Sequence, residues 1–64
     1  MTQQQKTIAD KWAGQSCTYQ GKPAKICGRL LDYGTVAPLD PSVPSIEYSW
    51  EAIDRVMNNG RNFK

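Results

Sequence analysis

The stretch Gln20–Leu30, QGKPAKICGRL, limits most strongly what this chain can fold into. Its apolar and polar residues alternate, which is the period-two pattern of a strand with one buried face. One side carries Ala24, Ile26, Gly28 and Leu30, and the other carries Pro23, Lys25, Cys27 and Arg29. Turn residues at 20–22 and 32–34 bound the stretch. We therefore expect a central strand with a neighbour on each side.

Turn residues divide the remaining chain into further short strands. The segment 16–19 is expected to form a hairpin with the central strand, and 35–37 a third strand that ends at Pro38. A loop over 39–44, which contains two prolines, should lead into a fourth strand at 45–48.

Two helical segments are expected outside these strands. Thr7 is a candidate N-cap for a helical turn over 8–13, and the polar residues 1–6 are expected to form a flexible tail. Ser49 is expected to cap a C-terminal helix that stops at Asn59-Gly60. Trp12 is interpreted as a lid on the core, with a ligand platform as the alternative.

Together these elements predict a mainly β fold, a small SH3-like barrel of four to five antiparallel strands with a short N-terminal helical turn and a C-terminal helix. Residues 7–64 should form its single domain, because 64 residues leave no room for a second. The expected core consists of Ala24, Ile26, Leu30, Val36, Ile46, Ile53 and Val56. So short a chain has a small stability margin, which keeps a homo-oligomer open as an alternative.

The composition of the chain limits the catalytic and metal-binding chemistry that it can support. The chain has no histidine, so Ser-His and Cys-His nucleophile pairs are excluded, and two cysteines are too few for a zinc site. We expect no cofactor, no metal and no enzymatic activity. Lacking a secretory signal and an apolar run of about 18 residues, the chain is expected to be cytoplasmic and not membrane-bound. Cys17 and Cys27 should then be reduced thiols, although a bridge stays open if the strand register places them opposite each other.

From Tyr19 to Val56 the pattern YQGKPAKICGRL, followed by YGTVAPLDPSVPSIEYSWEAIDRV, resembles the plasmid-encoded type B (type II) dihydrofolate reductases. The resemblance implies an SH3-like barrel that assembles as a tetramer around one pore. Gln20 and Gly21 match the family, and Tyr48 falls at its pore tyrosine.

The resemblance departs from the family at the other pore groups. Ile46 and Glu47 stand where the family has its pore glutamine and isoleucine, and the pore lysine would fall near Ala13. Copies of Glu47 around a symmetric pore would repel an anionic substrate. We therefore expect a shared fold without reductase activity.

The short chain, its tight hairpins and its WEAIDRVM ending are also similar to small accessory proteins of bacteriophages and mobile elements, many of which bind a host protein or nucleic acid. This resemblance implies a non-enzymatic binding module. Its candidate surface is a basic and aromatic face formed by Lys22, Lys25, Arg29, Tyr19 and Tyr33. Such a face suits phosphates and bases, and it suits an acidic protein groove equally well. The alternatives are a merely solvated sheet face, a self-assembling structural subunit, and a divergent relative of the pore-type reductases.

Overall fold

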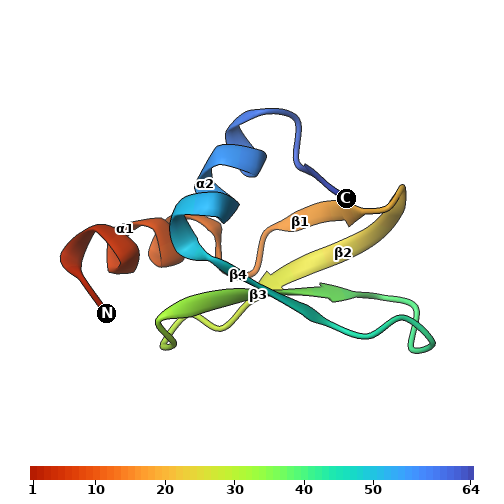
Figure 1. Cartoon of the computed structure of the whole chain (residues 1–64), viewed down its shortest axis with the longest axis horizontal. Coiled ribbons are helices and arrows are strands. Elements are labelled where there is room, and N and C mark those ends of the chain that lie inside the picture. Colours follow the sequence, from red (N-terminus) through yellow and green to blue (C-terminus); the bar gives the residue numbers. More distant parts are fainter.

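The computed structural model describes all 64 residues as one curled sheet with two helices (Figure 1). In chain order the elements are α1 (Gln3–Trp12), β1 (Ser16–Tyr19), β2 (Lys22–Cys27), β3 (Tyr33–Pro38), β4 (Ile46–Ser49), α2 (Trp50–Asn58) and β5 (Asn62–Phe63). The predicted β-rich fold with a helix near each end is therefore confirmed. No helix has the length and apolar character needed to cross a membrane.

The strands are ordered β4-β3-β2-β1-β5, so β2 lies within the sheet, as its alternation predicted. All neighbouring strands are antiparallel except β1 and β5, which are parallel. Strands β1 to β4 are antiparallel as predicted, whereas β5 joins β1 in parallel because the chain reaches β5 through α2 rather than through a hairpin. The ring centroids of Tyr48 on edge strand β4 and Phe63 on edge strand β5 lie 5.2 Å apart. The sheet is thus a half-barrel whose edges curl toward each other, which is compatible with an SH3-like fold.

One face of the sheet, called here the inner face, holds the core together with both helices. The buried apolar residues are Ile8, Ala9, Trp12, Cys17, Tyr19, Ala24, Ile26, Val36, Trp50, Ile53, Met57 and Phe63. Four expected core residues are among them, and Ile46 and Val56 are half-buried against the cluster. Leu30 is the exception, because its side chain is 90% exposed. Gly28 adopts a φ of +89°, which ends the alternation of β2 two residues before Leu30.

Gly34 on β3 allows α2 to approach the sheet closely. A Cβ atom at this position would lie 2.2 Å from Cδ1 of Ile53 and 2.9 Å from the ring of Trp50. These distances are shorter than any van der Waals contact, so the absence of a side chain at Gly34 makes room for the two most buried side chains of α2.

Helix α1 begins at Gln3, earlier than the helical turn expected over 8–13, so most of the segment expected as a tail is helical. The cap is Thr2 instead of Thr7: its side chain accepts a hydrogen bond from the amide of Gln5, and the Gln5 side chain accepts one from the amide of Thr2. This reciprocal pair is a capping box. Trp12 is buried at the end of the helix, and its indole N–H donates to Asp54 on α2 at 2.8 Å, in agreement with a lid on the core.

The remaining elements lie close to their predicted bounds. β1 matches, and Ser49 caps α2 by accepting a hydrogen bond from the amide of Ala52 at 3.2 Å. Both cysteines are free thiols. The register pairs Cys17 with Ala24 on the inner face and Cys27 with Thr35 on the other side of the sheet, so the two thiols point to opposite faces.

Candidate functional site at the β2–β3 loop

The three cations of the predicted basic face are spread over different parts of the molecule. Lys25 lies on the outer side of β2 and takes part in no ion pair. Lys22 lies at the start of β2 with its ammonium 3.7 Å from the carboxylate of Asp40. Arg29 lies beyond the end of β2, and its Nε donates to Asp10 on α1 at 2.8 Å. Two of the three cations thus already face a carboxylate of the same chain.

The two tyrosines of the predicted face are also separated. Tyr19 is only 7% exposed and belongs to the core, so its ring is not available to stack on a ligand. Tyr33 is 45% exposed at the start of β3. Arg29 and Tyr33 lie one on each side of the exposed Leu30, whereas Lys22 and Lys25 lie on β2, where Lys22 pairs with Tyr19.

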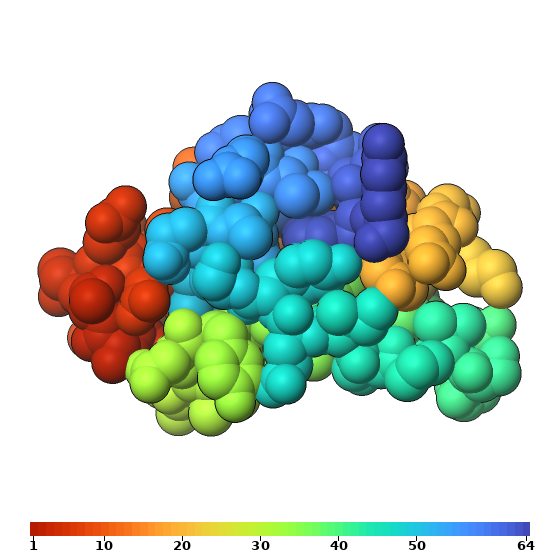
Figure 2. All heavy atoms as spheres, viewed as in Figure 1, coloured from red at the N-terminus to blue at the C-terminus, as the bar shows by residue number.

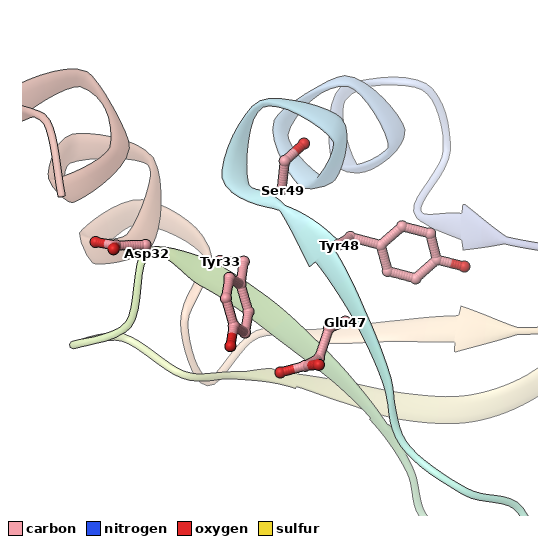
Figure 3. A pocket seen from close by; sticks show the side chains of 5 residues that line it. All are labelled: Asp32, Tyr33, Glu47, Tyr48 and Ser49. Atoms are coloured by element: carbon pink, nitrogen blue, oxygen red, sulfur yellow. The ribbon is translucent and has the colours of Figure 1, made fainter.

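The pore-type residues lie on both sides of β4. Ile46 and Tyr48 alternate with Glu47 and are half-buried toward the core, whereas Glu47 is exposed. Figure 3 shows the ring of Tyr48 directed away from the side chain of Glu47. Burial, and to a smaller extent the neighbouring Tyr19, raises the pKa of the Tyr48 phenol. Tyr48 therefore serves mainly to pack the closing edge of the half-barrel.

The loop between β2 and β3 places two leucines in solvent, where sequence alternation expected one of them in the core. Leu30 is 90% exposed and Leu31 is 50% exposed. We call this pair the leucine tip. The sequence signal that could have revealed it is the adjacent pair Leu30-Leu31 after Gly28, because two consecutive leucines cannot share one face of a strand.

Three polar contacts hold this loop in place. Arg29 is tied to α1 through Asp10, as described above. Asp32 accepts from the N-terminal ammonium of Met1 at 2.8 Å. The carbonyl of Leu31 accepts from the indole N–H of Trp50 on α2 at 2.8 Å. The contacts reach the loop from α1, from the N-terminus and from α2, so the leucine tip is exposed on a loop that is tied to three other parts of the chain.

Two hollows lie beside the leucine tip. One, of about 450 Å³, lies against α1 and is lined by Met1, Lys6, Asp10, Arg29 and Leu30. The other, of about 350 Å³, is lined by Asp32, Tyr33, Glu47, Tyr48 and Ser49. Figure 2 shows the loop as yellow-green spheres between the red N-terminal helix and the cyan segment around β4. Within the second hollow, Tyr33 and Glu47 point in the same direction (Figure 3). The loop therefore forms a ridge with a depression on each flank.

The charges around the ridge are largely balanced. Arg29 and the terminal ammonium each face a carboxylate, which leaves Lys6 as the cation of the α1 hollow outside any ion pair. No group of three or more His, Cys, Asp and Glu side chains comes together in a way that could hold a metal ion. The distinctive property of this end of the molecule is accordingly its exposed apolar side chains, while most of its charges are paired.

Comparison of the chain with protein-family models, with curated proteins and with solved structures found no match. The interpretation of the site therefore rests on its own geometry.

Proposed function

We propose that this protein is a small non-enzymatic binding module that docks a protein partner through the leucine tip. The observation that carries the proposal is a leucine 90% exposed on a loop held by three polar contacts. Exposed single leucines are common on protein surfaces. Here, however, four of the five large exposed apolar side chains gather at one end: Met1, Leu30, Leu31 and Tyr33, with only Leu39 elsewhere.

The energetics favour such a tip as an anchor. Transfer of a leucine side chain from water into an apolar pocket contributes about 1.5–3 kcal/mol. A fixed loop loses little conformational entropy on binding, so more of this free energy is retained as affinity. The hollow against α1 would receive side chains of the partner that surround the pocket for the leucines, in the manner of a central anchor with a polar rim.

The partner that best matches this surface is a protein with an apolar pocket. A nucleic acid or an acidic groove would use the cations predicted from the sequence, but Lys22 and Arg29 are engaged by carboxylates and Tyr19 is buried. An anionic membrane would need several free cations next to the leucines, and the adjoining hollow offers only Lys6. The role of an accessory protein in a phage or mobile element stays a prediction.

A pore-type reductase has less support. Pore chemistry would need the Ile46–Tyr48 segment to present its side chains to a shared pore, whereas Ile46 and Tyr48 pack toward the core of their own chain. The relationship to that family stays a hypothesis about the fold.

The test compares two leucines that differ in position. Affinity-tagged wild-type protein, Leu30→Ala and the matched control Leu39→Ala are used to capture proteins from a cell lysate, and the captured proteins are quantified by mass spectrometry. Leu39 is 60% exposed on the loop between β3 and β4, so its replacement removes a similar side chain away from the tip. We expect a protein that is retained by Leu39→Ala and lost with Leu30→Ala.

The purified partner is then titrated directly. Leu30→Ala should weaken its affinity about 10- to 100-fold, with little dependence on salt, because apolar burial is not screened by ions. Lys22→Met, which removes a cation of the predicted basic face away from the tip, should leave the affinity unchanged. The proposal is overturned if every captured protein binds Leu30→Ala as well as wild type, or if binding is lost with Lys22→Met and decreases steeply with salt.

A further inference from the structure

The outer face of the sheet is covered by no other part of the chain. The buried side chains of both helices join the single core on the inner face. Figure 1 shows α1 and α2 in the upper part of the molecule and the β3–β4 hairpin along its lower edge. A sheet that belongs to a layered fold usually has its exposed face either covered or studded with charged side chains.

The register defines which side chains occupy this outer face. From β4 to β5 they are Glu47, Ser49, Tyr33, Thr35, Ala37, Pro23, Lys25, Cys27, Ser16, Thr18 and Asn62. Only Glu47 and Lys25 carry a charge. Between them on β3 lie Thr35 and Ala37, two small side chains that are half-buried in the sheet surface. The face is therefore nearly neutral, with one anion and one cation on opposite sides of a smooth centre.

The positions of the two charges follow from strand geometry. Glu47 pairs with Thr35, and Ala37 pairs with Lys25, so the charges are two strands apart across the sheet and two residues apart along it. With strands about 4.8 Å apart and a rise of about 3.4 Å per residue, the two positions are separated by about 12 Å. Their midpoint lies on β3, between Thr35 and Ala37.

We propose that the outer face binds a second copy of this chain, face to face around a two-fold axis that passes over this midpoint. This axis lies in the plane between the two faces and is perpendicular to the line that joins Glu47 and Lys25. Rotation by 180° about it places Glu47 of each copy over Lys25 of the other. The arrangement is self-complementary, as a two-fold interface requires. The small side chains at its centre allow the two sheets to approach to the usual distance of about 10 Å.

Two consequences follow from the same axis. Cys27 is exposed, and the axis passes close to it, so the two Cys27 side chains would face each other across the interface. The axis also runs roughly along β3, so both β2–β3 loops would lie at the same end of the dimer. The dimer would present two leucine tips side by side, although the dimer itself does not depend on any function of the tip.

The experiment is a charge exchange followed by sedimentation. The wild-type chain is expected to show a concentration-dependent monomer–dimer equilibrium in analytical ultracentrifugation at low salt. Lys25→Glu and Glu47→Lys should each weaken the dimer at least tenfold, because each places like charges opposite each other. The double variant Lys25→Glu/Glu47→Lys should regain dimerisation. Lys6→Glu, which makes the same charge change on α1, serves as the control and should dimerise like wild type.

Thiol crosslinking provides a second readout that does not depend on charge. A short bismaleimide should link two copies of the wild-type chain through Cys27 and fail with Cys27→Ser, since Cys17 is buried. A chain that sediments as a monomer at all concentrations overturns the proposal. So does a dimer that both single charge reversals leave intact, which would point to a different interface, or a double variant that stays monomeric.

Discussion

The two connections that flank β2 differ in what determines their shape. The β1–β2 turn consists of Gln20 and Gly21, with φ values of +51° and +79°. Positive φ at both central residues is the geometry of the two-residue hairpin turn that follows the twist of the strands. The β2–β3 loop turns at Gly28, with a φ of +89°, and then relies on contacts with α1, the N-terminus and α2.

This difference separates a turn that its own residues specify from a loop that the rest of the fold holds. The β1–β2 turn is polar and serves the sheet. The β2–β3 loop orders two exposed leucines, although folding alone would favour polar residues there. A position where local sequence preference and structure disagree is a candidate functional site.

The largest expected effect is on the free energy of unfolding, and it comes from replacing the glycines near the two connections, Gly34 and Gly21. Gly34→Ala would force a methyl group against Ile53 and Trp50 and should lower the free energy of unfolding by about 1–3 kcal/mol, as overpacking of a core does. Gly21→Ala meets no atom within 4 Å and carries only the strain of its positive φ, about 1–2 kcal/mol, partly offset by the lower entropy of the unfolded chain. Urea unfolding of both variants measures the difference. A Gly34→Ala variant as stable as wild type would show that α2 lies farther from β3.

Trp50→Phe should have a smaller effect, one confined largely to the β2–β3 loop. The change keeps an aromatic ring in the core but removes the N–H that donates to the carbonyl of Leu31. Loss of this hydrogen bond should cost about 1 kcal/mol, in addition to the smaller ring volume. Amide hydrogen exchange should become faster in the β2–β3 loop and stay unchanged at Gln20 and Gly21. Equal acceleration at both connections would mean that the loop does not depend on its anchors.

Much of the fold follows from local signals in the sequence. The alternation around Ile26, the turn at Gly21 and the Ser49 cap specify β2, the first hairpin and α2 because each acts over a few residues. The sequence carries two capping patterns near its start, Thr2 with Gln5 and Thr7 with Asp10, and α1 begins at the first of them instead of at the predicted Thr7.

The candidate site was less predictable because it depends on contacts between distant residues. The Asp10–Arg29 and Trp50–Leu31 contacts each join residues 19 apart in sequence. The predicted basic face failed to come together because alternation was extended through Gly28, where the backbone leaves the strand. Phe63 and its parallel pairing with β1 were missed because two residues show no periodicity.

The smallest expected effect is the pH response of the Lys22–Asp40 contact beside the β1–β2 turn. Asp40 accepts hydrogen bonds from the amide and the hydroxyl of Ser42, at 3.0 and 2.8 Å, and lies 3.7 Å from the ammonium of Lys22. The Ser42 hydrogen bonds, ahead of Lys22, lower the pKa of Asp40 below its ordinary value of 3.8.

A carboxyl group whose pKa is lower in the folded chain stabilises the fold above its unfolded-state pKa, and this contribution is lost as the pH falls through the folded-state pKa. NMR titration of the Ser42 amide should therefore give a midpoint below 3.8. In the variants, the titration is followed at the carboxyl group of Asp40 itself. Ser42→Ala should raise its midpoint more than Lys22→Met does, because the Ser42 hydroxyl donates a direct hydrogen bond to the carboxylate, whereas the exposed ammonium at 3.7 Å acts through solvent. A larger shift with Lys22→Met would mean that the charge of Lys22 is the main cause of the low pKa of Asp40. The β1–β2 turn, like the β2–β3 loop, would then depend on a contact with a residue distant in the sequence.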